Sequence, residues 1–201
     1  MQVTKEDIKV IRQALELARE EFCIKKRDLT KDNIKLLRDA LSSFRMIGLE
    51  KLYEFVPEVT PFLSSCNSAL RESAVDTLGS PFSLHLPEFR ETAYQIWLED
   101  QDDCVKESAL RSWICYYHGT KDSEVLKTLY SILKNEKHPV LVRIDALNGI
   151  FRVSGEEPTF YELDISSLIQ LDSNQELNDE IDWDEVTKVM KRYAPKALKQ
   201  K

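Results

Sequence analysis

Val105-Lys106-Glu107-Ser108-Ala109-Leu110 is one of four closely similar stretches in this chain of 201 residues. The others read LLRDAL at 36–41, LRESAV at 70–75 and VRIDAL at 142–147, and the four alanines are separated by 34, 35 and 37 residues. A repeat of this length is typical of stacked helix pairs, in which each pair buries its apolar face against its neighbours. The stretch therefore predicts an all-α protein without a sheet.

The residues around the last three stretches follow the same period. Each stretch is preceded by three apolar residues at spacing i, i+3, i+4, which is one face of a helix, and each is followed by an apolar residue four positions after its alanine. These residues are Val59-Phe62-Leu63, Tyr94-Trp97-Leu98 and Leu129-Ile132-Leu133 upstream, with Leu78, Trp113 and Ile150 downstream. We expect turns near 64–68, 100–103 and 135–139, and small alanines where paired helices cross closely.

The pattern Val-Arg-x-x-Ala-Leu after an acidic turn resembles the HEAT repeat, in the short bacterial form of phycobilisome-lyase-like proteins. The resemblance covers roughly residues 30–155 and is clearest in the third unit, whose turn holds Asp102 and Asp103. The fourth unit departs from the pattern, with His138 and Pro139 in its turn. The resemblance implies an α-α superhelix, a solenoid of helical pairs. It also implies that the aligned basic residues pair with the turn acid of a neighbouring unit; they are Arg71, Lys106 and Arg143.

The chain is predicted to form a single domain of three consecutive parts. Residues 1–50 are expected to be N-terminal capping helices, 51–155 the core repeats, and 156–201 an acidic connector with a C-terminal capping helix. Asp182 is expected to cap that last helix. No long apolar run or signal peptide is present, which favours a cytoplasmic protein without a membrane span. The cysteines form no CxxC pair and are interpreted as reduced, buried thiols; they are Cys23, Cys66, Cys104 and Cys115.

Charge is distributed unevenly along the chain, whose formal net charge is −7. Residues 153–187 hold eleven acids and no lysine or arginine, whereas the last fourteen residues hold six basic residues and no acid. One interpretation is a solvated connector followed by a helix whose basic end suits its own dipole. The other is an acidic face that docks a basic partner. The sequence leaves both open.

Motifs that carry chemistry are scarce. The three histidines lie far apart in sequence and form no metal-ligand pattern, and there is no phosphate-binding glycine loop or nucleophile elbow. Trp97 and Trp113 match apolar positions of the repeat, so they are interpreted as core residues. We therefore predict no catalytic residue, no metal and no cofactor.

The predicted function is non-catalytic: a scaffold that binds another protein with a basic surface, for example as an inhibitor or immunity protein against a basic toxin. The alternative is a HEAT-like enzyme or enzyme subunit, either bilin lyase-like or alkyl-DNA glycosylase-like. A pI near 5.2 disfavours nucleic acid, since phosphate contacts need a basic face. The residues expected to bind the partner are Glu72, Asp76, Glu107, Arg111, Asn148, Glu156, Glu157, Asp179 and Glu180.

Overall fold

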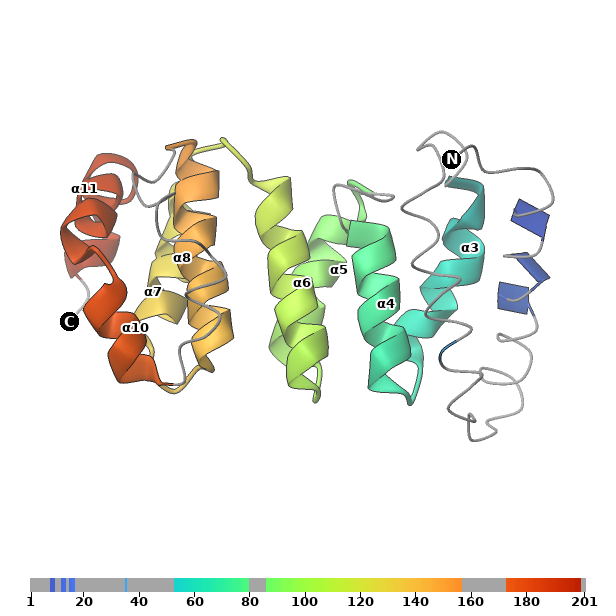
Figure 1. Cartoon of the computed structure of the whole chain (residues 1–201). Helices are drawn as coiled ribbons and strands as arrows, with labels where there is room; N and C mark the ends of the chain where they lie inside the picture. The colour runs from blue at the N-terminus through green and yellow to red at the C-terminus, as the bar shows by residue number, and fades with distance from the viewer. Residues whose placement is uncertain are drawn as a thin grey trace. The chain divides into compact units, whose positions relative to one another are not determined.

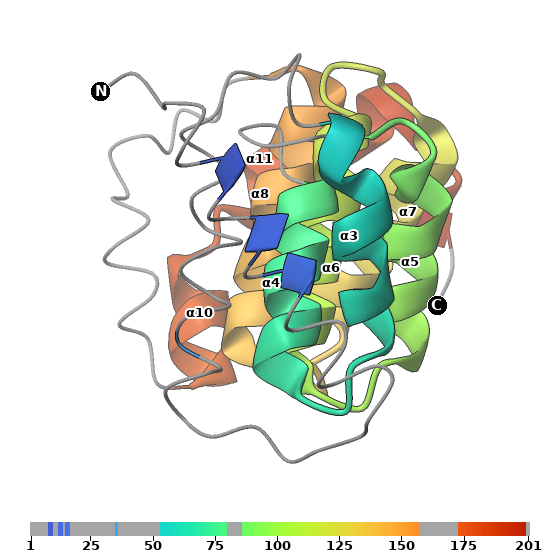
Figure 2. The same cartoon turned by 90° about the vertical axis from the view of Figure 1, so that its right-hand side faces the viewer.

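A computed structural model describes residues 8, 9, 12, 13, 15, 16, 35, 53–79, 86–156 and 173–199 (Figures 1 and 2). Throughout these residues the regular structure is helical and contains no strand, which confirms the predicted all-α class. The α-helices are α3 (Val56–Val59), α4 (Ser68–Gly79), α5 (Phe89–Glu99), α6 (Asp103–Tyr116), α7 (Ser123–Lys134), α8 (Val140–Ser154), α10 (Asn174–Glu180) and α11 (Trp183–Tyr193). Short 3-10 helices are η4 (Tyr53–Phe55), η5 (Thr60–Ser64) and η7 (Ala197–Lys199).

The chain divides into two compact units, residues 1–113 and 114–201, and the division falls within α6. The predicted capping helices of residues 1–50 lie almost wholly outside the described residues. The single-domain organisation predicted from the repeat therefore stays a prediction. Within the described part of the chain, no helix is long and apolar enough to cross a membrane.

In the first unit the stretches at 70–75 and 105–110 lie on α4 and α6 and the triplet of the third repeat lies on α5, as predicted, whereas the triplet Val59-Phe62-Leu63 spans the end of α3 and the 3-10 helix η5 instead of one α-helix. The turn between α5 and α6 spans 100–102, inside the range expected from the sequence. Ala74 and Ala109 are fully buried, and the ring of Tyr94 on α5 lies 4.8 Å, centroid to centroid, from that of Trp113 on α6. The prediction that Leu98 belongs to the buried stripe is wrong, because its side chain is 53% exposed.

An ion pair joins α4 to the turn between α5 and α6. The Arg71 guanidinium donates through Nε and Nη2 to the two carboxylate oxygens of Asp100, at 2.8 Å each, and through Nη1 to the Ser65 carbonyl. Two parallel bonds of this kind fix both the distance and the orientation of the groups they join. The basic residue of the second repeat, Arg71, therefore pairs with the turn acid of the third repeat, Asp100, as expected.

The second unit is built on the pair α7 and α8, which pack along each other and are joined by the predicted turn at 135–139 (Figure 1). Asp122 caps the N-terminus of α7, and its carboxylate accepts the N–H groups of Glu124 and Val125. Gly155 caps the C-terminus of α8 in the left-handed conformation that favours glycine. Helix α11 packs against α7 and α8, and Asp182 caps its N-terminus, as predicted. The repeat positions buried here are Leu129, Ile132, Leu133, Ala146 and Ile150.

Close helix contacts recur at matching repeat positions. In the first unit, a Cβ placed on Gly79 of α4 would lie 2.7 Å from the Cβ of Ser112 on α6. In the second unit, a Cβ placed on Gly149 of α8 would lie 2.9 Å from Cδ1 of Ile114, which is also on α6. Both contacts occupy matching positions of the repeat. Each joins the residue five positions after the alanine of one repeat to the residue three positions after the alanine of the next repeat. The missing side chain of a glycine allows the approach in each case.

The basic residue of the fourth repeat has a different environment from that of the second. Arg143 is 1% exposed, and burial lowers the pKa of its guanidinium. It donates to the Leu133 carbonyl at 2.7 Å and to the side-chain oxygens of Asn174 and Asn178 at 2.7 and 2.5 Å. The expected turn acid is thus replaced by two neutral carboxamides of α10. Their side-chain nitrogens in turn bond the carbonyl and the carboxylate of Glu136, so α10 is tied to the 135–139 turn.

The interpretation of the cysteines as buried thiols is wrong for two of them. Cys66 and Cys104 are exposed, and Cys115 is partly exposed. Cys104 lies in the first turn of α6, where the apolar stripe covers only one face of the helix. Cys23 lies outside the described residues.

Candidate functional site

The residues predicted to bind a partner fall into both units. Glu72 and Asp76 on α4 are half-buried, and on α6 Glu107 is half-buried while Arg111 is exposed. The remainder belong to the second unit and are described separately below. That all nine residues share one binding face stays a prediction.

In the first unit, acids from two helices gather around one thiol. The pKa of the Cys104 thiol is raised, first by burial and then by the charges of Asp102, Glu72, Glu107 and Asp103. A thiolate at this point would meet four carboxylates, which come from α4, from α6 and from the turn before it. We call Glu72, Asp102, Asp103 and Glu107 the acidic cluster. The structure thus brings together Glu72 and Glu107, which the sequence placed on consecutive repeats.

The four carboxylates of the acidic cluster differ in their hydrogen-bond partners and in their exposure to solvent. The Ser68 hydroxyl, followed by backbone N–H groups, holds the pKa of Asp102 below its usual value, so this carboxylate is ionised and helps to begin α6. Glu107 accepts a hydrogen bond of 3.0 Å from Arg111, four residues later on the same helix. Arg111 therefore offsets part of the charge that the sequence assigned to this face. Asp103 is exposed in the first turn of α6.

In the second unit, the acids that appear uncompensated in the sequence are partly compensated in space. Glu156 pairs with Arg192 of the basic C-terminal helix. Asp179 and Glu180 are exposed on α10, and Asp179 accepts a hydrogen bond from Gln175. Asn148 is half-buried on α8, and Glu157 lies outside the described residues. The count of eleven acids therefore overstates the charge of this part of the protein.

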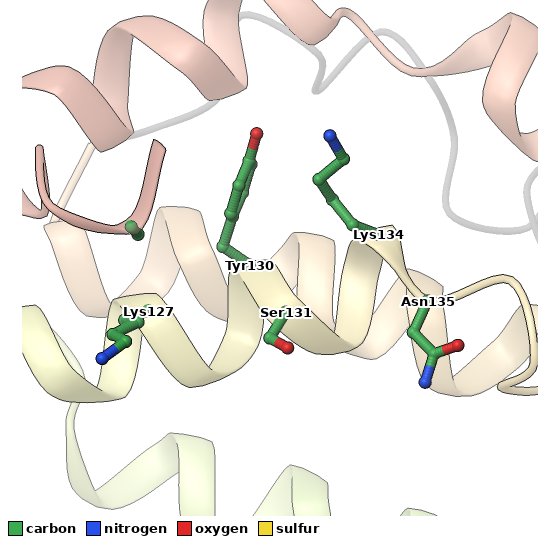
Figure 3. A pocket seen from close by; sticks show the side chains of 6 residues that line it. Lys127, Tyr130, Ser131, Lys134 and Asn135 are labelled. Atoms are coloured by element: carbon green, nitrogen blue, oxygen red, sulfur yellow. The ribbon is translucent and has the colours of Figure 1, made fainter. Parts of the chain in front are cut away.

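Sequence reasoning missed two arrangements in the second unit. The first is the set of bonds around Arg143 described above, which the i, i+4 spacing of Asn174 and Asn178 could have suggested. The second is a depression beside α7 that carries two lysines (Figure 3). Its signal was the spacing of seven residues between Lys127 and Lys134, which is about two helical turns and places their Cα atoms on one face of α7.

The chemistry available at the acidic cluster is that of binding. Its carboxylates can pair with lysine or arginine side chains of a partner, while Arg71 beside Asp102 and Arg111 beside Glu107 are the chain's own cations there. Within the described residues, no group of three or more histidine, cysteine or acidic side chains is arranged to hold a metal ion.

Comparisons with protein-family models, with curated protein sequences and with solved structures found no match for this chain. The HEAT-like interpretation therefore rests on the residues and contacts of this chain.

Proposed function

We propose that this chain is a short superhelix of HEAT-like helix pairs that binds a protein with a basic surface. Two kinds of contact support the stacking. One is the bidentate pair between Arg71 and Asp100, which joins consecutive repeats as the resemblance implies. The other is the pair of close contacts at Gly79 and Gly149. In both, the position five residues after one repeat alanine meets the position three residues after the next repeat alanine, so successive repeats pack in the same way. A stack of this kind offers an extended binding surface.

The observation that carries the binding proposal is the acidic cluster. Glu72 on α4 and Glu107 on α6, together with Asp102 and Asp103, all raise the pKa of the Cys104 thiol, so these four carboxylates act on one place, where Arg71 and Arg111 offset part of their charge. A concentrated field of one sign steers an oppositely charged partner and rejects partners of like charge. Inhibition of a basic toxin is one activity that such a surface serves.

The alternative is an enzyme or enzyme subunit on the same scaffold, of the bilin lyase or DNA glycosylase type. A glycosylase has to neutralise phosphates with basic residues along its binding face. The acidic cluster on α4 and α6 opposes that interaction, so the protein-binding function is favoured.

The test is a comparison of partner capture by three forms of the chain. The wild type, a Glu72→Lys/Asp76→Lys/Glu107→Lys variant, and a Lys188→Gln/Lys196→Gln control are immobilised and exposed to source-cell lysate at low salt. Captured proteins are then quantified by mass spectrometry. We expect a basic protein that the wild type and the control retain and that the triple variant loses. Association should also slow as salt shortens the Debye length below about 10 Å.

Two results would count against the proposal. One is a partner that all three forms retain equally at high salt. The other is turnover of a small-molecule or nucleic-acid substrate by the purified chain, which would favour the enzyme. Circular dichroism of each variant shows whether a loss of capture reflects a loss of fold.

A further inference from the structure

A depression of about 190 Å³ lies on the solvent-facing side of α7 (Figure 3). Five of the residues that line it form two rows along the helix with a spacing of four residues, and Ala197 of η7 completes the lining. The rows are Lys127, Ser131 and Asn135, and Tyr130 and Lys134. Figure 3 shows Tyr130 and Lys134 extending to one side and the other row to the opposite side, so the depression is the groove between two ridges of the helix. We call it the α7 groove.

The polar groups of the α7 groove suit an anion. Its lining carries two ammonium groups, a phenol, a hydroxyl and a carboxamide, and no carboxylate. The side-chain oxygen of Asn135 already accepts the Lys137 backbone N–H at 3.1 Å, so its NH₂ group is the part that can donate to a ligand. Every other polar side chain of the groove is able to donate a hydrogen bond.

The two lysines are not committed to strong ion pairs. Lys127 lies 3.9 Å from Glu124, whose side chain is 81% exposed, so the attraction is weak. Lys134 makes no ion pair with any residue that the structure describes, and its ammonium lies 5.7 Å from the centroid of the Tyr130 ring. Figure 3 shows the two ammonium groups extending to opposite sides of α7, so an anion that engages both requires the lysine side chains to swing toward the groove; neither has to break a buried contact to do so.

The repeat itself does not require these residues. Aligned through their apolar triplets, α5 and α7 differ at the groove positions: Thr92 corresponds to Lys127, Gln95 to Tyr130, and Glu99 to Lys134. Helix packing thus explains the buried face of α7 but not the donors on its outer face. The volume lies below the roughly 300–1,000 Å³ of sites for drug-sized molecules, which points to a small ligand.

We propose that the α7 groove binds a small anion through a phosphate or carboxylate group. Lys127 and Lys134 supply the charge, and the hydroxyls of Tyr130 and Ser131 donate hydrogen bonds. Such bonds to a charged acceptor are stronger than those between neutral groups. This site is independent of the proposed protein partner, because it lies in the second unit and selects the opposite charge.

The test is an NMR titration of the full chain with sodium phosphate, and separately with sodium acetate, at a constant ionic strength kept with sodium chloride. We expect saturable shifts of the backbone amides of residues 127–135 and of Ala197, with a dissociation constant on the order of 1 mM. Lys127→Gln and Lys134→Gln should each weaken binding about tenfold, the loss expected for a charge-assisted hydrogen bond. Tyr130→Phe, which keeps the ring, should weaken it about threefold.

Lys137→Gln is the matched control, because it removes the same charge from an exposed lysine outside the groove. It should leave the dissociation constant unchanged. Saturation by phosphate alone would assign a phosphate ligand, and saturation by acetate as well would assign the shared anion chemistry. Shifts that rise linearly for both salts, or equal weakening by Lys137→Gln and Lys134→Gln, would overturn the proposal. The lysine variants change exposed side chains, and an unchanged amide spectrum without ligand shows that the fold is retained.

Discussion

The ion pair between Arg71 and Asp100 should stabilise the first unit far more than an ordinary surface pair. The change to make is a double-mutant cycle with Arg71→Met, Asp100→Asn and the two together. Both side chains are largely withdrawn from solvent, at 16% and 11% exposure, and two bonds of 2.8 Å join them. Each partner shifts the other's pKa in the direction of the charged form, raising that of Arg71 and lowering that of Asp100.

The magnitude follows from this geometry. A hydrogen bond to a charged group contributes about 1.5–3 kcal/mol net, and two such bonds share the desolvation cost of a single pair. We therefore expect a coupling free energy of about 2–3 kcal/mol. The bond from Arg71 to the Ser65 carbonyl is lost in every form that carries Arg71→Met, so it cancels in the cycle.

The assay is urea unfolding followed by tryptophan fluorescence. Trp97 and Trp113 are buried in the first unit, and Trp183→Phe in the background removes the third tryptophan, which belongs to the second unit. The signal then reports on the unit that holds the ion pair. The control is the same cycle on Arg111 and Glu107, an i, i+4 pair in which the arginine is 48% exposed. That pair should couple by no more than about 0.5 kcal/mol.

The pH dependence gives an independent check. The hydrogen bond from Arg71 holds the pKa of Asp100 below its ordinary value of 3.8. Since the folded-state pKa is the lower one, this contribution is present above pH 3.8 and is lost as the pH falls through the folded-state pKa. Asp100→Asn should remove this component of the acid destabilisation. Equal coupling in the two cycles, or an acid profile that Asp100→Asn leaves unchanged, would refute the reasoning.

Three further substitutions test the repeat and its last turn by urea unfolding. Ala109→Leu overfills a fully buried position and should cost about 1–3 kcal/mol; an unchanged midpoint would mean that the repeats are misaligned. Arg143→Met should lower the free energy of unfolding by about 3 kcal/mol, because it leaves a buried carbonyl and two carboxamides without their donor. Its control, Arg152→Met on the exposed side of α8, should lower it by less than about 0.5 kcal/mol. Asp182→Ala removes the cap of α11 and should cost about 1 kcal/mol, and a smaller loss than for Arg152→Met would contradict this role.

The sequence predicted best those features that depend on periodic burial. The spacing of the repeat alanines identified Ala74, Ala109 and Ala146 as buried, and all three are at 0% exposure. The turn at 135–139 was also predicted to the residue. Each of these features follows from a local pattern, since a helix face repeats every three to four residues and a helix pair every 34–37.

What the sequence could not predict depends on which charges meet in space. The count of acids over 153–187 suggested an uncompensated surface, but Glu156 meets Arg192, thirty-six residues later. Leu98 fitted the apolar spacing, yet the helix turns it toward solvent because the buried stripe of α5 is narrower than the triplet implied. Periodicity specifies the face of a helix, and long-range pairing decides the charge that the face presents.

The environment of Arg143 indicates where the repeat pattern ends. Residues 177–182 read LNDEID and follow VRIDAL at 142–147 by a step of 35, so they stand where a fifth repeat stretch would begin. Leu177 and Ile181, at the positions of Val142 and Ala146, are buried. Asn178 takes the place of the basic residue; its side-chain oxygen accepts from Arg143, and its side-chain nitrogen donates back to Glu136 of the 135–139 turn. Asp182 then begins α11 and stops the stretch from extending as one helix. Because position 178 faces the Arg143 guanidinium and not a turn acid, a neutral side chain that can accept a hydrogen bond is suited to it, whereas a lysine or arginine there would repel Arg143.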